Sequence, residues 1–207
     1  MIKAIIFDFD GTLCTTHGLG FEAMQRTAEK FDETISKEKW ASFEGLNREE
    51  KIKKAFPSKA KEMIPTYNDF YETIFVERAE PLGNAIEALE QLKKNHKLFI
   101  FSTKYTDSIN KGLTKFGIKD CFLEVLGKEN LEKQKPDKWG VEFLLSKYSF
   151  KREEVVLVGD SLVDEQASKN AGIRFIQFVN PKEEKNVLGN YSKIRSHLEL
   201  VTLLPKL

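Results

Sequence analysis

The chain has 207 residues, with 33 lysines and arginines against 32 aspartates and glutamates, so its formal net charge is +1. This length suffices for one sizeable hydrophobic core, or for a core with a small second lobe. The even charge balance argues against nucleic acid or a membrane surface as the main partner. The two cysteines are too few for a disulfide framework, and no apolar run approaches the length of a membrane helix. We therefore expect a reducing, cytoplasmic setting.

The first predicted element is a buried strand over residues 2–8, because a short run rich in isoleucine is typical of a parallel sheet. The run leads into the sequence Asp8-Phe9-Asp10-Gly11-Thr12. Aspartate is disfavoured in strands, and a buried carboxylate is costly without a partner. Two carboxylates at this point suggest a ligand site, since open α/β sheets bind ligands at the ends of their strands.

Residues 17–79 have the periodicity of helices and no strand-like alternation. One helix face is formed by Phe21, Met24, Ala28 and Phe31. We expect breaks between helices at Gly45, at Pro57-Ser58 and at Pro65. This stretch is interpreted as a small all-helical lobe.

From Pro81 onward, predicted strands alternate with predicted helices, which indicates an α/β fold with a doubly wound parallel sheet. The expected strands cover residues 97–101, 122–126, 155–159 and 173–179. The expected helices cover 86–92, 106–117 and 137–148, a stretch ending at Gly172, and a closing segment over 192–204. His17, His96 and His197 are scattered, and each is expected in a loop or at the surface.

Polar groups follow two of these later strands as they follow the first. The strand 97–101 leads into Ser102-Thr103-Lys104, and the strand 155–159 leads into a segment with Asp160 and Asp164. Lys135-Pro136 lies between the two strands along the chain. Hydroxyl, ammonium and carboxylate groups of this kind suit phosphate or a hard metal ion.

The four motifs, taken in order, resemble those of the haloacid dehalogenase-like hydrolase superfamily: DxDGT, a Ser or Thr after a hydrophobic strand, a Lys, and GDxxxD. The helical lobe after the first motif is similar to that of the helical-cap, phosphoglycolate phosphatase-like subgroup. The resemblance implies a Rossmann-like core domain of residues 1–14 and 81–207, with a helical cap domain of residues 15–80 inserted into it.

The resemblance also implies catalytic roles. Asp8 would be the nucleophile that forms an aspartyl-phosphate, and Asp10 would be the general acid and base. Ser102 would hydrogen-bond the phosphoryl group, and Lys135 would neutralise its charge. The alternatives are a turn residue at Ser102 and a helix-capping carboxylate at Asp164.

The implied cofactor is Mg²⁺, with the metal site assigned to Asp8, Asp10 through its backbone carbonyl, Asp160 and Asp164. Asp164 would orient Lys135 or a metal-bound water. The candidate substrate-binding residues are Gly11, Thr12, Thr103, Lys104 and Arg48. Lys104 is equally compatible with a solvated surface lysine. Arg48 follows Gly45-Leu46-Asn47, which is similar to the family's turn that faces the active site, but it also fits a solvent-facing helix start.

We therefore expect a Mg²⁺-dependent phosphatase for a small phosphorylated metabolite, as a monomer or a weak homodimer. Asp10 favours this activity over dehalogenation, because the dehalogenases of the family lack the second aspartate. The alternatives are a phosphomutase that uses the same aspartyl-phosphate and a non-catalytic phosphate-binding or signalling protein. The substrate stays open among phosphoglycolate, sugar phosphates, nucleotides and pyrophosphate.

Overall fold

The computed structural model describes residues 1–43, 46–180 and 187–207. Contacts within the chain divide it into two compact units. The first, which we call the sheet unit, consists of Met1–Thr15 and Glu80–Leu207, and the second, the helical unit, consists of Thr16–Ala79. No helix in the described part of the chain is long and apolar enough to cross a membrane.

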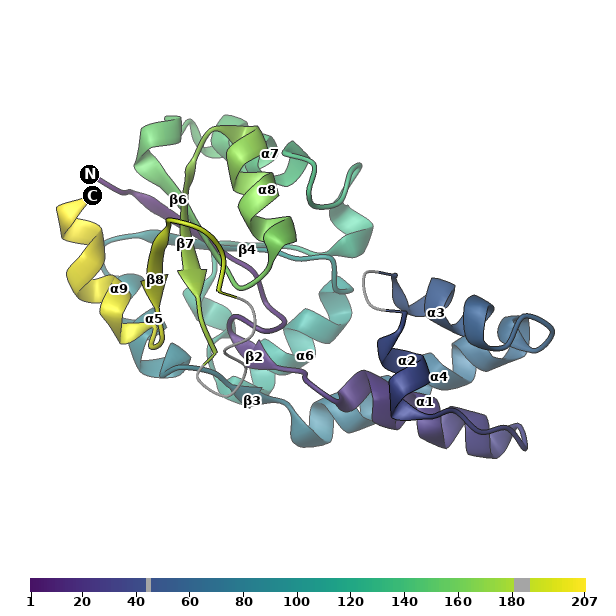
Figure 1. Cartoon of the computed structure of the whole chain (residues 1–207). Helices are drawn as coiled ribbons and strands as arrows, with labels where there is room; N and C mark the ends of the chain where they lie inside the picture. The colour runs from purple at the N-terminus through teal and green to yellow at the C-terminus, as the bar shows by residue number, and fades with distance from the viewer. Residues whose placement is uncertain (44–45, 181–186) are drawn as a thin grey trace. The chain divides into compact units, whose positions relative to one another are not determined.

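The sheet unit contains a parallel sheet with the strand order β5-β4-β1-β6-β7-β8 among the described residues (Figure 1). The strands are β1 (Ala4–Phe7), β4 (Lys97–Phe101), β5 (Glu124–Leu126), β6 (Val155–Gly159), β7 (Arg174–Phe178) and β8 (Ser192–Ile194). The first strand lies in the middle, where Phe7 is level with Ile100 of β4 and Val158 of β6. This arrangement confirms the predicted doubly wound parallel sheet, and it places the turns after β1, β4 and β6 at one edge.

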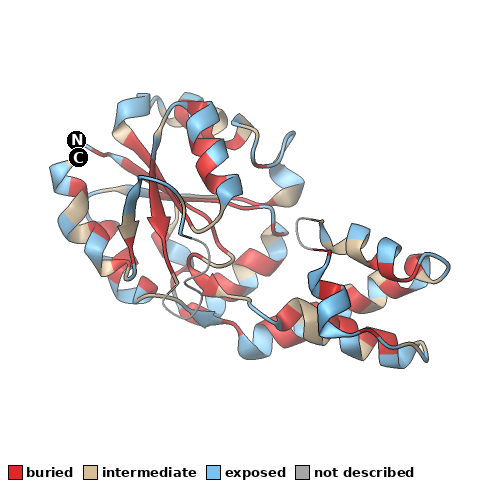
Figure 2. Cartoon of the chain, viewed as in Figure 1, coloured by how far each residue is buried: buried red, intermediate tan, exposed pale blue. Residues whose placement is uncertain are grey.

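Helices cover both faces of the sheet (Figure 1). One face carries α7 (Trp139–Tyr148) and α8 (Leu162–Ala171), and the other carries α5 (Ala85–Leu92), α6 (Thr106–Phe116) and α9 (Leu198–Leu203). Short 3₁₀ turns occupy Lys119–Cys121 (η1), Lys128–Asn130 (η2), Arg152–Glu154 (η3) and Leu204–Lys206 (η5). Because neighbouring residues of a strand point to opposite faces, a strand covered on both sides must be apolar throughout. Strands β1 and β6 are accordingly buried along their length, and β4 is buried from Leu98 onward (Figure 2).

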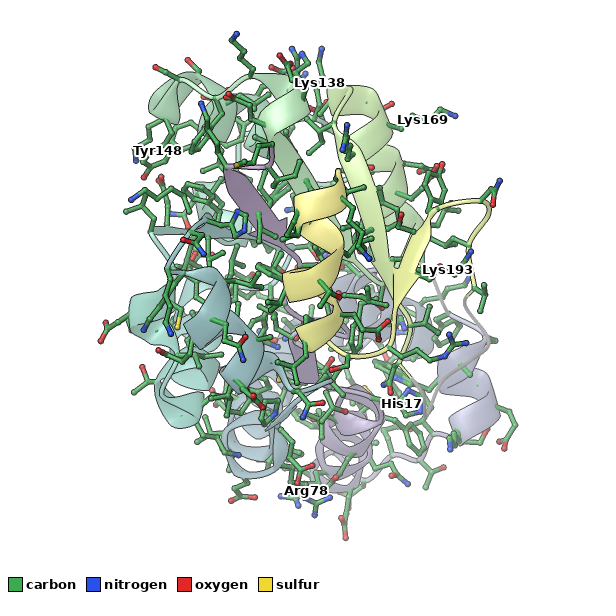
Figure 3. The ribbon with its side chains drawn as sticks, turned by 90° about the vertical axis from the view of Figure 1, so that its left-hand side faces the viewer. His17, Arg78, Lys138, Tyr148, Lys169 and Lys193 are labelled. Carbon is green, nitrogen blue, oxygen red and sulfur yellow. The ribbon has the colours of Figure 1, made fainter. Side chains whose placement is uncertain are left out.

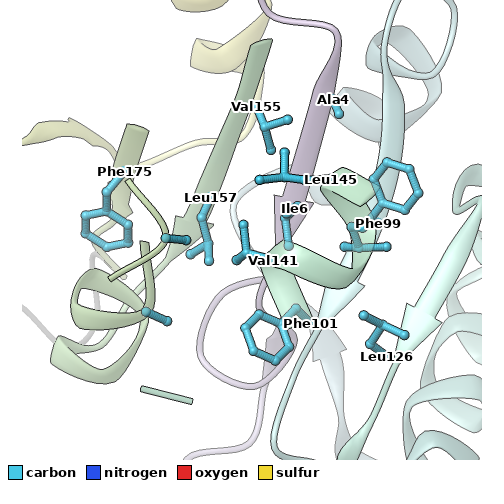
Figure 4. Packing of buried hydrophobic residues seen from close by; sticks show 13 residues of the cluster. Ala4, Ile6, Phe99, Phe101, Leu126, Val141, Leu145, Val155, Leu157 and Phe175 are labelled. Carbon is cyan, nitrogen blue, oxygen red and sulfur yellow. The ribbon is translucent and has the colours of Figure 1, made fainter. Parts of the chain in front are cut away.

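The core beneath α7 and α8 shows how this packing works. Ile6 of β1, Phe99 of β4 and Leu157 of β6 belong to one buried cluster with Val141 and Leu145 of α7 (Figure 4). Full burial of each such side chain contributes about 1.5–3 kcal/mol to the free energy of folding. The cluster therefore holds the three central strands in fixed register, and with them the turns that follow these strands.

The helical unit contains α1 (Leu19–Lys30), α2 (Lys37–Ala41), α3 (Arg48–Ala55) and α4 (Ala60–Arg78), with α1 packed against α4. Tyr67, Tyr71 and Phe75 recur every four residues along α4, and their rings are stacked in sequence. The Arg48 guanidinium carbon lies 3.5 Å from the centre of the Tyr71 ring, which is a cation–π contact. In the sheet unit, β2 (Cys14–Thr15) and β3 (Glu80–Pro81) pair antiparallel where the chain leaves and re-enters that unit.

Two predicted boundaries are wrong. Pro65 lies inside α4 and does not break it. A proline in a helix interior costs about 3 kcal/mol, and burial of large side chains such as Tyr67, Tyr71 and Phe75 on the same helix offsets that cost. The second wrong boundary is the predicted closing helix over residues 192–204. Residues 192–194 form strand β8, in which Ile194 is buried, and the helix α9 starts only at Leu198. The predicted break at Gly45 lies outside the described residues.

Candidate active site

The turns after β1, β4 and β6 carry most of the residues that the sequence singles out. Asp8 is the first residue beyond β1, and its backbone N–H still donates to the carbonyl of Val158, at 2.9 Å. Asp160 follows β6 directly, and Ser102 follows β4. Because these strands are parallel neighbours, their carboxyl ends meet at one edge of the sheet.

Lys135 links two of the carboxylates. Its Nζ lies 2.8 Å from Asp8 Oδ1 and 2.5 Å from Asp164 Oδ1, and the lysine side chain is only 3% exposed. Burial lowers the pKa of Lys135 because it disfavours the charged ammonium. The neighbouring carboxylates of Asp164 and Asp8 have the larger effect together and hold this pKa above its ordinary value. The lysine is therefore a permanent positive charge beside Asp8.

Three carboxylates crowd around this single ammonium. Asp8, Asp160 and Asp164 each offer one oxygen, and these oxygens all lie within 4.8 Å of one another. Burial raises the pKa of Asp8 to about 6, although the nearby Lys135 ammonium lowers it. The pKa of Asp160 is raised to about 8, first by burial and then by the negative charges of Asp8 and Asp164. The site thus has more negative charge than Lys135 neutralises, and its oxygen ligands fit a hard divalent cation.

The Asp160 carboxylate is held by the turn after β1. Thr12 Oγ1 donates to Asp160 Oδ1 at 2.9 Å, and the Thr12 side chain is fully buried. Gly11 has φ +77°, and a Cβ there would lie 2.5 Å from Asp160 Oδ2. Glycine is required at this position for both reasons, because other residues strain in the left-handed region and a methyl group has no space. Gly11 and Thr12 therefore fix the orientation of Asp160.

Asp164 is held on both of its oxygens. Lys135 donates to Oδ1, while the Ser161 Oγ donates to Oδ2 at 2.5 Å and the Ser161 N–H at 3.1 Å. The Ser161 Oγ in turn accepts from the Asp164 N–H, which forms a reciprocal cap at the start of α8. Sequence reasoning missed Ser161, although its spacing from Asp164 is that of a capping box.

The turn after β4 places its three polar residues differently. Ser102 is buried, and its N–H donates to the Leu126 carbonyl at 3.0 Å. Thr103 is exposed. Lys104 is buried, and its Nζ lies 3.2 Å from Asp10 Oδ1, so the interpretation of a solvated surface lysine is wrong.

The sheet unit therefore brings together Asp8, Asp160, Asp164 and Lys135, with Gly11 and Thr12 beside Asp160 and with Lys104 beside Asp10. Ser102 and Thr103 lie in the turn after β4, the strand next to β1. Arg48 belongs to the helical unit, where it begins α3 and lies on Tyr71. Gly45 of the expected substrate-facing turn lies outside the described residues. A buried glutamine that no motif predicts, Gln177, donates to the Asp160 carbonyl at 3.4 Å.

Comparison with known proteins identifies the family of the chain and proteins of similar fold. A family model described as haloacid dehalogenase-like hydrolase matches residues 5–178. The chain is 32% identical over 176 residues to the pyrophosphatase PpaX of Listeria innocua, covering 82% of this chain and 80% of that protein. In fold it is similar to a putative β-phosphoglucomutase of Thermotoga maritima (TM-score 0.83, 22% identity, all of both chains). It is also similar to a predicted phosphoglycolate phosphatase of Haemophilus somnus (TM-score 0.82, 19% identity, 98% of both chains).

Proposed function

The chain belongs to the haloacid dehalogenase-like hydrolase family, and from this we propose that it is a Mg²⁺-dependent phosphatase that hydrolyses a small phosphorylated metabolite through an aspartyl-phosphate. The observation that carries the proposal is the Asp8 carboxylate, held 2.8 Å from the buried ammonium of Lys135 with a second carboxylate, Asp10, two residues further on. A carboxylate attacks a phosphate ester only where positive charge reduces their mutual repulsion.

The two aspartates divide the reaction between them. An Asp8 oxygen attacks phosphorus, and the leaving oxygen takes a proton from Asp10. A water then attacks the aspartyl-phosphate and gives its proton to Asp10. The Asp10 side chain is 31% exposed, whereas that of Asp8 is 12% exposed, so Asp10 is the better placed of the two to exchange protons with solvent.

The metal would be held by the side chains of Asp8 and Asp160 and by the backbone carbonyl of Asp10. When bound, Mg²⁺ supplies the positive charge that lets the phosphoryl oxygens approach these carboxylates. We assign Asp164 to orienting Lys135, because Lys135 and Ser161 already occupy its two oxygens. Thr12 acts through its hydrogen bond to Asp160.

Phosphoryl binding is assigned to the Ser102 hydroxyl and to backbone N–H groups around Gly11 and Thr103. We further propose that residues 15–80 act as a cap domain that selects the substrate, with Arg48 as a candidate contact for a carboxylate or a second phosphate. The relatives at 32% identity are named pyrophosphatases, which makes inorganic pyrophosphate the first substrate to test.

The test is phosphate release from pyrophosphate, phosphoglycolate, sugar phosphates and nucleotides, each with Mg²⁺ and with chelator. We expect release from at least one of them that requires Mg²⁺. Interconversion of β-phosphosugars without phosphate release would instead identify a phosphomutase. No reaction with any of them from a folded protein would overturn the proposal.

Metal binding predicts a change in stability that can be measured without substrate. Mg²⁺ binds the folded protein and has no preformed site in the unfolded chain, so saturating metal should raise the melting temperature. At about 100 times the dissociation constant the gain is about 2.7 kcal/mol. The measurement is thermal unfolding across a Mg²⁺ titration.

Two variants and one control localise the effect. Asp160→Asn should abolish the Mg²⁺-dependent shift. Thr12→Val, which removes the hydrogen bond to Asp160 at nearly constant side-chain volume, should weaken the apparent affinity for Mg²⁺ about 10-fold. Asp120→Asn changes an exposed carboxylate on η1 and should behave as wild type. An undiminished shift in Asp160→Asn would place the metal elsewhere.

A further inference from the structure

Lys104 is a second buried lysine near the proposed active site. Its side chain is 0% exposed, and its Nζ lies 3.2 Å from Asp10 Oδ1 and 3.4 Å from Asp10 Oδ2. Lysine is almost never fully buried unless it is paired, because removing an ammonium from water is costly. Other lysines of the sheet unit, such as Lys138 and Lys169, extend from the ribbon (Figure 3). The burial of Lys104 beside Asp10 therefore calls for an explanation.

The backbone from which Lys104 extends is fixed at both ends. The Lys104 N–H donates to Ser102 Oγ at 3.4 Å, and the Lys104 carbonyl accepts from the Lys128 N–H at 2.8 Å. Ser102 itself is bonded through its N–H to Leu126 of β5. Because the backbone is held by these bonds and the side chain is fully buried, the Lys104 ammonium is confined beside the Asp10 carboxylate.

The two buried lysines have different partners. Lys135 is bracketed by Asp8 and Asp164, whereas Lys104 contacts both oxygens of Asp10. Each lysine thus serves one of the two carboxylates of the first motif. A role in orienting Asp10 explains this contact more directly than the contact with substrate that the sequence suggests.

We propose that Lys104 is a positioning residue that holds Asp10 as the base for the second half of the reaction. This inference rests on the proposed function. In that half, the water oxygen attacks phosphorus, the bond between phosphorus and the Asp8 oxygen breaks with its electron pair returning to the Asp8 carboxylate, and the water proton passes to Asp10. An Asp10 carboxylate without Lys104 would still be present but would be poorly aimed at the water.

The test uses p-nitrophenyl phosphate, whose leaving group departs without needing a proton from Asp10. We expect Lys104→Met to form the aspartyl-phosphate at the normal rate and to hydrolyse it slowly. Rapid mixing should show a burst of about one p-nitrophenol per enzyme, then turnover about 10- to 100-fold slower than wild type, with kcat/KM nearly unchanged. Acid-quenched protein should carry a phosphate adduct by mass spectrometry, and Lys104→Arg should recover much of the rate.

A double-variant cycle tests whether Lys104 acts through Asp10. Asp10→Asn should give the same burst, and Lys104→Met combined with Asp10→Asn should be no slower than Asp10→Asn alone. Lys169→Met, which changes an exposed lysine of α8, should match wild type. If Lys104→Met does not fold, Lys104→Gln must show the same burst.

The other outcomes count against the inference. Equal losses in kcat and kcat/KM without a burst would assign Lys104 to the first chemical step. A rise in KM alone would make it a substrate contact. Additive losses in the double variant would show that it does not act through Asp10. If the wild type releases neither phosphate nor p-nitrophenol, the proposed function itself fails, and that result is distinct from all three.

Discussion

Asp8→Asn is expected to reduce phosphate release by at least about 10⁴-fold, because an amide cannot replace a carboxylate as the nucleophile. The substitution preserves the shape of the side chain. The loss of activity in Asp8→Asn should appear in kcat with every substrate that the wild type hydrolyses. No phosphate adduct should accumulate in the acid-quenched protein. The measurement is steady-state phosphate release with Mg²⁺ at saturating substrate.

The variant should fold, which makes a loss of activity interpretable. Lys135 keeps its bond to Asp164 at 2.5 Å when the Asp8 charge is removed, so no unpaired buried ammonium is created. Removing one of three crowded carboxylates also relieves repulsion within the site. A melting temperature close to that of wild type is therefore expected. Retention of more than about 1% of the activity would exclude Asp8 as the nucleophile.

The arrangement of the site could be predicted from the sequence because it depends on one property of parallel sheets. Residues that follow neighbouring strands meet at the same edge, so Asp8 and Asp160 must be close once their strands are identified as central. The strand interiors are uniformly apolar, which makes them recognisable without a structure. Lys135 comes from a loop, and only its family motif indicated that it would reach the same point.

The contacts that could not be predicted depend on tertiary packing. Lys104 was compatible with the surface or the site, and only the fold shows that it is buried against Asp10. Pro65 has the local signature of a helix break, yet packing around it keeps α4 intact. Residues 192–194 have a helical pattern in isolation, but an open edge of β7 was available to pair with them. Local propensity yields to long-range contacts in each case.

His197 is the clearest case of a residue whose environment differs from the expectation. A surface or loop position was predicted, and His197 does lie in the turn before α9. Its ring, however, is completely buried and stacks on Phe178 with centroids 4.5 Å apart. Nδ1 lies 3.1 Å from the Gly83 carbonyl, and Nε2 has no hydrogen-bond partner in the described part of the chain. A neutral ring that donates from Nδ1 fits this site, whereas a protonated ring would bury an unpaired N–H at Nε2.

This environment predicts that the protein loses stability in acid. Burial lowers the pKa of His197 to about 4, below its ordinary value of about 6.5 in the unfolded chain. Between these values the unfolded chain binds the extra proton and the folded protein does not. The contribution of His197 to the free energy of unfolding is therefore fully present above pH 6.5 and is lost as the pH falls. The loss between pH 7 and pH 4 is about 3 kcal/mol. Urea unfolding across this range measures the loss.

The contribution of His197 must be separated from that of the site carboxylates. Asp8 and Asp160 have raised pKa values, so they stabilise the folded state as the pH falls and act in the opposite direction. The difference between wild type and His197→Phe removes this background. The Gly83 carbonyl keeps its bonds from the His197 N–H and the Ser196 hydroxyl in that variant, and the phenyl ring can still stack on Phe178.

Between pH 7 and pH 4, the free energy of unfolding of His197→Phe should therefore fall by about 3 kcal/mol less than that of wild type. Histidine ring signals in an NMR titration give a second measurement that needs no variant, because the His197 signal should stay constant until well below pH 6. A His197 ring that titrates near pH 6.5 in the folded protein would show that its burial does not control its charge, and the acid sensitivity would then need another source.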